Sequence, residues 1–398
     1  MRLQPRYHAL RDRILGLALL LLVAGCSEEG APATPTACGV RAVRAGGNHT
    51  CVVSPTGGLR CWGAGTDGQL GDGALMDRAV PPESDVLEGV RTVAAGSVHT
   101  CAVTEAGGVR CWGSGSSGRL GDGRSADRAT PTETDVLTGV QDISLGRTHT
   151  CALMNNGGVR CWGGNALGQL GDGTTDDRAA PPASDVLAGA IAVSAGGSHT
   201  CALMKGGGVR CWGGNSFGQL GDGTTTDRTS PPDTDVISGV KMVSTGDIHT
   251  CVLLNTGGIR CWGHNINGEL GIGSYAEVLS PPANDVLSSA SAVAAGYLFT
   301  CGVSQAGGVR CWGYNGRGQI GDSTDLEVDR LQPAESDVLS GVEAITVGTS
   351  HVCALMKQTH GVRCWGHNGS GQLGNGTAPD HSMFPPAADL PNLGQSCP

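Results

Sequence analysis

The residues best suited to chemistry in this chain are its 17 cysteines, because thiolates bind zinc and paired thiols form disulfides. Fourteen of them form pairs that recur about every fifty residues, and a tryptophan follows the second cysteine each time. Zinc ligands come in short clusters that meet at one ion, whereas nine or ten residues separate the partners here. The spacing therefore predicts disulfides and no metal site. The seven predicted pairs are Cys51 with Cys61, Cys101 with Cys111, Cys151 with Cys161, Cys201 with Cys211, Cys251 with Cys261, Cys301 with Cys311 and Cys353 with Cys364.

Histidine, arginine and aspartate also recur at fixed places in the repeat. An arginine precedes every second cysteine, from Arg60 to Arg363, and an aspartate precedes each third apolar run, from Asp85 to Asp389. A working site needs only one or two copies to differ, so repetition in every copy indicates scaffolding. We expect structural hydrogen bonds from the histidines and buried Arg–carboxylate pairs. The histidines are His49, His99, His149, His199, His249 and His351, with Phe299 in the sixth repeat.

The elements that position these residues are short β-strands. In the third repeat, residues 149–154 and 158–163 favour strands and are joined by a turn of Asn and Gly, which predicts a hairpin with Cys151 opposite Cys161. A third apolar run, residues 190–195, completes the unit. Because no helical periodicity is present, seven such antiparallel sheets predict an all-β, seven-bladed β-propeller. A linear β-solenoid is the alternative.

The motifs His-Thr, Trp-Gly and Gly-Gln-Leu-Gly recur in this order in the repeat. This pattern resembles the repeat of the regulator of chromosome condensation family, and the resemblance covers residues 39 to about 390. It implies a seven-bladed propeller. It also implies protein–protein interaction, because the family includes a nucleotide-exchange factor for a small nuclear GTPase and secreted inhibitors of β-lactamases.

The N-terminal residues are expected to lie outside the propeller. Four arginines precede an apolar run at 14–24, which is too short to span a membrane and is typical of a signal peptide. The run ends in Leu-Val-Ala-Gly-Cys, which resembles the lipobox of bacterial lipoproteins, with Cys26 lipidated; an ordinary signal peptide is the alternative. We expect a signal peptide at 1–25, a flexible tether at 26–37 and the propeller at 38–398. The chain would then be exported and lipid-anchored in the bacterial cell envelope, on the outer membrane or cell surface, where thiols oxidise.

Two cysteines outside the pairs, Cys38 and Cys397, flank the predicted ring. They should meet at its seam, and we expect a disulfide between them. Function is expected where the repeats disagree: the hairpin turns, the four residues after Trp-Gly and the loop before the proline pair. Aromatic, imidazole and guanidinium groups there are suited to binding. The candidate partner-binding residues are Phe217, His264, Asn265, Tyr275, Tyr314, Arg317 and His367.

No Ser/His/Asp set, paired carboxylates or phosphate-binding loop stands out from the repeated background. We therefore predict a monomeric binding module for a protein or a surface glycan, without catalysis or cofactor. The net charge of −10 disfavours nucleic acid as a partner, and the membrane is contacted only through the lipid. The alternatives are an extracellular carbohydrate-active or other hydrolytic enzyme that uses one propeller face, and a structural component of the cell surface.

Overall fold

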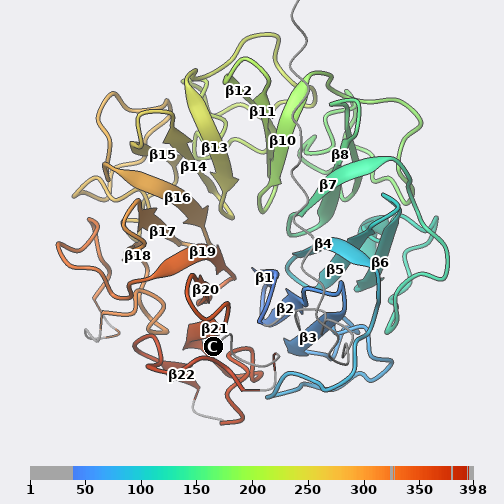
Figure 1. Ribbon diagram of the computed structural model, residues 1–398. Coiled ribbons are helices and arrows are strands. Elements are labelled where there is room, and N and C mark those ends of the chain that lie inside the picture. The colour runs from blue at the N-terminus through green and yellow to red at the C-terminus, as the bar shows by residue number, and fades with distance from the viewer. Residues whose placement is uncertain (1–38, 323–325, 327, 378–379, 392, 394–398) are drawn as a thin grey trace, which may run out of the picture. The chain divides into compact units, whose positions relative to one another are not determined.

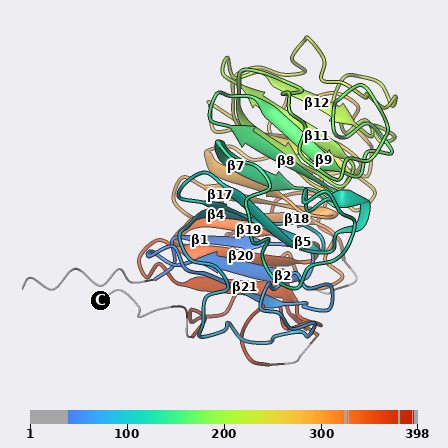
Figure 2. The ribbon, with the colours of Figure 1, turned by 90° about the vertical axis from the view of Figure 1, so that its right-hand side faces the viewer.

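Seven separate antiparallel sheets surround a central axis in the computed structural model, which describes residues 39–322, 326, 328–377, 380–391 and 393 (Figure 1). Six sheets have three strands, and the last has four, in the order β19-β20-β21-β22. Figure 2 shows the same sheets from the side. The arrangement confirms the predicted seven-bladed β-propeller, and the alternative of a linear solenoid is wrong.

Each blade is built from an inner, a middle and an outer strand. The inner strands are β1 (Ala42–Ala45), β4 (Val90–Ala95), β7 (Val140–Leu145), β10 (Ala190–Ala195), β13 (Val240–Thr245), β16 (Ala290–Ala295) and β19 (Val342–Val347). The middle strands are β2 (His49–Val53), β5 (His99–Thr104), β8 (His149–Met154), β11 (His199–Met204), β14 (His249–Leu254), β17 (Phe299–Ser304) and β20 (His351–Met356). The outer strands are β3 (Leu59–Gly63), β6 (Val109–Gly113), β9 (Val159–Gly163), β12 (Val209–Gly213), β15 (Ile259–Gly263), β18 (Val309–Gly313) and β21 (Val362–His367). The seventh blade adds β22 (His381–Ser382), and the 3-10 helix η1 (Ser116–Gly118) lies in the second.

The third apolar run of the predicted unit belongs to the following blade. β10 pairs with β11, the first strand of the next hairpin, and not with the hairpin that precedes it. The free edge of that preceding hairpin is occupied, because Gly163 and Val159 of β9 pair with Arg178 and Leu187 as the chain returns along the outer edge. The run therefore becomes the innermost strand of a new sheet.

Each blade contains one disulfide between its middle and outer strands, and the partners lie directly opposite one another with Cα atoms 4.0–4.2 Å apart. The predicted hairpin disulfides are thus confirmed in all seven blades. They join Cys51 with Cys61, Cys101 with Cys111, Cys151 with Cys161, Cys201 with Cys211, Cys251 with Cys261, Cys301 with Cys311 and Cys353 with Cys364. Cys26, Cys38 and Cys397 lie outside the described residues, so the lipidation and the seam disulfide stay predictions.

Each tryptophan fills the interface between its own blade and the one before it. Trp212 is fully buried, and its indole N–H donates to the Gln169 carbonyl of the preceding blade over 3.1 Å. Thr200 donates its hydroxyl to the same carbonyl. Gly171 has a φ of +77°, and a Cβ there would lie 2.5 Å from the Trp212 indole nitrogen. The Gly-Gln-Leu-Gly motif is therefore the surface on which the next tryptophan packs.

A buried histidine completes six of the seven interfaces. The Nε2 atom of His149 lies 2.9 Å from the Thr200 hydroxyl of the next blade, and His49, His99, His199, His249 and His351 repeat this contact over 2.8–3.0 Å. Because the Thr200 hydroxyl already donates to a carbonyl, His149 must donate through Nε2–H. In the remaining interface Phe299 faces the seventh blade, where Val352 stands at the threonine position. An apolar pair thus replaces a polar one.

The repeated arginines and aspartates pair within each blade and remain partly exposed. Arg160 Nε lies 2.6 Å from Asp185, and the two side chains are 22% and 21% exposed. The other six repeats form the same pair. The expectation that these ion pairs are buried is therefore wrong, because both side chains are partly exposed. The aspartate follows the return along the outer edge of the blade, where water still reaches it.

The seam between the seventh and first blades uses the same tryptophan and histidine contacts as five of the other interfaces. Trp62 donates to the Gln372 carbonyl over 3.0 Å, and the Thr50 hydroxyl lies 3.0 Å from His351 Nε2. Val52 and Leu355 belong to one buried cluster across the seam. Among the described strands, no blade mixes strands from the two ends of the chain. The described part of the ring is therefore closed by side-chain packing of its first and last blades, together with backbone hydrogen bonds such as that from Thr349 to Gly47.

Candidate functional site

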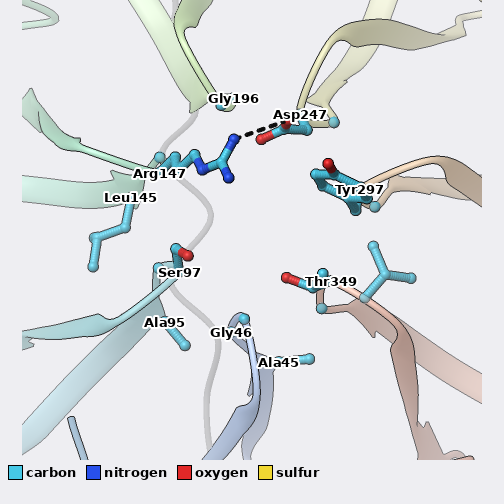
Figure 3. Close-up of a pocket in the computed structure, with 18 of the residues that line it drawn as sticks. Ala45, Gly46, Ala95, Ser97, Leu145, Arg147, Gly196, Asp247, Tyr297 and Thr349 are labelled. Atoms are coloured by element: carbon cyan, nitrogen blue, oxygen red, sulfur yellow. Dashed lines mark ion pairs between the residues drawn. The ribbon is translucent and has the colours of Figure 1, made fainter. Parts of the chain in front are cut away.

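The seven turns that join inner and middle strands surround one end of the central channel. We call this side of the propeller the mouth face and the side with the turns between middle and outer strands the hairpin face. The seven turns, residues 46–48 in the first blade and their equivalents, enclose a cavity of about 420 Å³ (Figure 3). Cavities of this size accommodate small molecules or a side chain of a partner protein.

One position in these turns carries a different kind of side chain in almost every blade. The first residue of each turn is glycine, so the backbone is constant, whereas the second residue varies. The varying residues are Gly47, Ser97, Arg147, Gly197, Asp247, Tyr297 and Thr349, and all of them line the cavity. The sequence reasoning missed this set. Comparing the repeats column by column at two residues before the histidine would have found it.

Arg147 and Asp247 form an ion pair across the mouth. Arg147 Nη1 lies 3.7 Å from Asp247 Oδ2, although the two residues belong to the third and fifth blades (Figure 3). Gly197 of the intervening blade leaves the necessary room, because a Cβ there would lie 2.2 Å from Asp247 Oδ1. Burial raises the pKa of Asp247, and the Arg147 guanidinium opposes this shift. Among the residues that the structure describes, Asp247 is the only carboxylate that lines this cavity.

The residues after Trp-Gly lie on the same face, outside the mouth. The backbone N–H of His264 donates to the Ile248 carbonyl beside the mouth turn, and Tyr314 and His367 bond in the same way to Leu298 and Ser350. The Phe217 ring meets the His264 ring edge-on at 4.7 Å between centroids. Most of the predicted binding residues are thus brought onto one face, around a mouth that the prediction did not include.

Two of the predicted binding residues are buried and serve their own loops. Asn265 is fully buried, and its amide donates to the Ser274 and Ala276 carbonyls. His264 is 8% exposed, and its Nδ1 lies 2.5 Å from the fully buried Glu269 carboxylate. Neither side chain is therefore available to a partner in this structure. Glu269 stands where five other blades have glutamine, and in the seventh blade His367 and Gln372 make the corresponding contact over 2.8 Å.

The other predicted residues are accessible to different degrees. Tyr275 is 59% exposed on the loop that Asn265 supports, and Arg317 is also exposed. Phe217, Tyr314 and His367 are partly buried. Partial burial, followed by the Arg317 guanidinium, lowers the pKa of His367. The contact between Phe217 and His264, and the effect of Arg317 on His367, each link consecutive blades.

Large accessible side chains lie at several places on the mouth face, including Leu75 and Met76 in the first blade. Ile266 is 65% exposed on the fifth blade, and Tyr297 and Arg317 belong to the sixth. The corresponding loops of the first two blades are built from small residues, Ala-Gly-Thr at 64–66 and Ser-Gly-Ser at 114–116. The fold is seven-fold repetitive, but this face is not. Such an asymmetric face is better suited to binding one asymmetric partner than to binding a partner with seven-fold symmetry.

The described residues contain neither a group of side chains that could hold a metal ion nor a helix that could span a membrane. No group of three or more His, Cys, Asp or Glu side chains in this part of the chain is placed to hold a metal ion. The six buried histidines are distributed among separate interfaces, one in each. Across the residues that the structure describes, no helix has the length and apolar character needed to cross a membrane.

Seven sheets with the same interface contacts, closed around one channel, define a β-propeller built from a single repeated blade. The chain belongs to the regulator of chromosome condensation (RCC1) repeat family. One pattern of this description matches residues 40–69, 90–119, 140–169, 190–219, 240–269, 290–319 and 342–372. A second pattern matches residues 56–103, 106–153, 156–203 and 206–253. No match was found among curated protein sequences.

Three solved structures illustrate the likeness in fold. Human WBSCR16 superposes with a TM-score of 0.70 and 23% identity, over 80% of this chain and 86% of that one. Prp20p from Saccharomyces cerevisiae, described with its binding to Gsp1p and histones, gives a TM-score of 0.63 and 22% identity, over 77% and 80% of the chains. The yeast complex of Kap60 with RCC1 (Prp20) gives 0.70 and 19%, over 92% and 90%. At these identities the likeness concerns the fold.

Proposed function

We propose that this chain is an exported, lipid-anchored propeller that binds another protein through its mouth face and performs no catalysis. The observation that carries the proposal is the variation of the mouth. Scaffold positions repeat from blade to blade, whereas the second residue of the mouth turn ranges from glycine to arginine, aspartate and tyrosine. A scaffold that is held constant while one surface varies is typical of a recognition surface.

Two further features support protein binding. Prp20p is described with its binding to Gsp1p and histones, and yeast RCC1 (Prp20) with Kap60, so the same fold presents surfaces to proteins elsewhere. The accessible groups on the mouth face include Ile266, Tyr297 and Arg317, and aromatic and arginine residues are enriched at binding hot spots. The enzyme alternative calls for clustered carboxylates near the axis. Within the described part of the chain, Asp247 lines the mouth cavity as its sole carboxylate and is paired with Arg147.

The described chain begins on the hairpin face. The Val40 N–H donates to the His360 carbonyl, which lies in the turn between β20 and β21. The tether of a lipid on Cys26 would therefore join the described chain on the hairpin face. We propose this arrangement for the bacterial envelope, together with a Cys38–Cys397 disulfide at the seam and a monomeric state.

Capture from envelope fractions by the immobilised mature chain tests the proposal. The test variant combines Ile266→Ser, Tyr297→Ala and Arg317→Ala on the mouth face. The matched control replaces Lys205 and Lys357, two exposed residues in turns of the hairpin face, by alanine. We expect a protein that the wild-type and control chains retain and that the mouth variant binds at least about tenfold more weakly. Equal retention by all three chains, or no retained protein at all, would overturn the proposal.

Mass spectrometry tests the proposed maturation. A mature chain that begins at a lipidated Cys26 and has no free thiol at Cys38 or Cys397 is the expected result. An unmodified N-terminus, or a reactive thiol at either cysteine in the non-reduced protein, would contradict the anchor or the seam disulfide, respectively.

A further inference from the structure

The channel continues below the mouth into a second cavity. This inner cavity of about 340 Å³ is lined by the inner strands and shares Ala45, Ala95 and Leu145 with the cavity at the mouth. Its lining consists of small and branched apolar residues, the hydroxyls of Ser144, Ser244 and Thr346, and the charged side chain of Arg44. The Arg44 side chain is exposed to the solvent of the channel, so its guanidinium can reach a ligand there.

Arg44 occupies a position where the other blades have small residues. Its counterparts are Ala94, Ser144, Ser194, Ser244, Ala294 and Thr346. Where a hydroxyl is present, it accepts a bond from the backbone N–H of the neighbouring inner strand, as Ser144 does from Ala195 and Thr346 does from Ala45, each over 3.0 Å. Arginine has no acceptor atom and gives up this bond. The scaffold therefore does not account for Arg44.

The Arg44 guanidinium has donors to spare. Its one hydrogen bond within the described residues goes from Nη1 to the Val43 carbonyl, over 3.0 Å, and it takes part in no ion pair there. The side chain is surrounded by the ring but accessible to solvent within the channel. Enclosure lowers the pKa of Arg44, and the Asp142 carboxylate opposes the shift from beyond ion-pair distance. The group stays positively charged because an arginine pKa lies far above neutrality.

The geometry points to a binding site for a small organic carboxylate in this inner cavity, with Arg44 as its charged ligand. A planar guanidinium matches a carboxylate through two parallel N–H···O bonds. The nearby hydroxyls of Ser144 and Thr346 add polar contacts, and Ile143, Leu145 and Val293 form an apolar wall for a short aliphatic body. Asp142 competes electrostatically with such a ligand. The site is separate from the proposed protein-binding face.

Calorimetric titration of the full mature chain with sodium isobutyrate tests this site, with isobutyramide as the uncharged isostere. We expect isobutyrate to bind and isobutyramide not to bind. Arg44→Ser restores the residue type found in three other blades, so it should fold, and it should weaken isobutyrate binding at least about tenfold. Asp142→Asn removes the competing charge and should strengthen binding. Arg124→Ser, at an exposed residue in the loop that follows η1, is the control and should leave binding unchanged.

Three outcomes would overturn the inference. They are equal binding of isobutyrate to the wild-type chain and to the Arg44→Ser variant, equal binding of isobutyrate and isobutyramide, and no binding of isobutyrate to the wild-type chain. Titration with inorganic phosphate identifies the anion class. If phosphate binds in an Arg44-dependent way and isobutyrate does not, the carboxylate assignment is wrong. Thermal unfolding of each variant without ligand confirms that a loss of binding is not a loss of fold.

Discussion

The buried histidines should make the propeller sensitive to mild acid, and one interface of the chain supplies the substitution that tests this. Burial lowers the pKa of His149 to about 4, and the nearby Arg119 guanidinium contributes to the shift. Its Nδ1 atom is buried without a hydrogen-bond partner among the described residues, so a proton there would have nothing to bond. Unfolding exposes the ring and returns its pKa to about 6.5. The unfolded chain therefore binds more protons, and stability falls as the pH falls below about 6.5.

The size of the effect follows from the difference between the two pKa values. At about pH 5, one histidine with a folded pKa of about 4 loses about 2 kcal/mol of stability relative to neutral pH. Burial also lowers the pKa of His49 and His249 to about 4 and that of His199 and His351 to about 3. Neighbouring histidines contribute to the shifts of His199 and His351, so the losses are coupled, and the whole ring should lose more stability than one histidine does. The loss should continue until the pH reaches the folded pKa values.

The test variant is His149→Phe combined with Thr200→Val, which reproduces the pair Phe299 and Val352 in another interface. Near neutral pH the variant should keep its stability to within about 1 kcal/mol. Both partners of the His149–Thr200 bond become apolar, and the Gln169 carbonyl, which loses its bond from Thr200, keeps the one from Trp212. At about pH 5 it should be less destabilised than the wild type by about 2 kcal/mol. Guanidinium-induced unfolding of the oxidised protein at both pH values, followed by tryptophan fluorescence, measures the difference.

The single variant Thr200→Val serves as the control. It leaves the Nε2–H of His149 buried without an acceptor, and it should cost about 1–3 kcal/mol near neutral pH. If the double variant loses as much stability between neutral pH and about pH 5 as the wild type does, the reasoning from buried histidines is refuted.

Three other perturbations probe the scaffold. Removing one hairpin disulfide by Cys151→Ala and Cys161→Ala should lower the free energy of unfolding by about 2–3 kcal/mol, because this disulfide closes a short loop of the unfolded chain. Denaturant titrations measure the loss, and an unchanged free energy of unfolding would contradict this role. Gly171→Ala should destabilise the protein more than a surface substitution does, since its Cβ would strike Trp212, and an unchanged melting temperature would refute the close contact. Asp235→Asn should cost less than about 1 kcal/mol in the same assay, because its pair with Arg210 is partly exposed, and a larger loss would show that the pair matters more than its exposure indicates.

The sequence was sufficient for the architecture because the repeat is a pattern of spacing. Cysteine pairs such as Cys251 and Cys261, ten residues apart, fix a hairpin, and seven copies fix the number of blades. The burial of individual side chains was harder to predict. The pair of Arg160 and Asp185 repeats in every blade, as core residues do, yet it lies at the partly exposed outer edge. Repetition shows that a contact is structural and does not show how far it lies from water.

The candidate site was predicted only in part. His264 was selected for its imidazole, but Glu269 replaces the glutamine of five other blades, and the two form a buried pair. Conversely, Arg147 and Asp247 lie in mouth turns 100 residues apart in the sequence, and only the circular arrangement of the blades brings them together. Radial position in a propeller depends on all seven blades, so reading one repeat at a time does not reveal it.

The way the seam closes has a consequence for the chain's connectivity. Each blade takes all of its described strands from one continuous segment. The contact between the last and first blades repeats the tryptophan contact of the other six interfaces and the histidine contact of five of them. The pairing of strands in the ring therefore does not depend on which blade comes first in the chain. A circular permutant opened in any turn of the hairpin face should assemble the same seven interfaces, and duplication or loss of a single blade becomes a change of one genetic module.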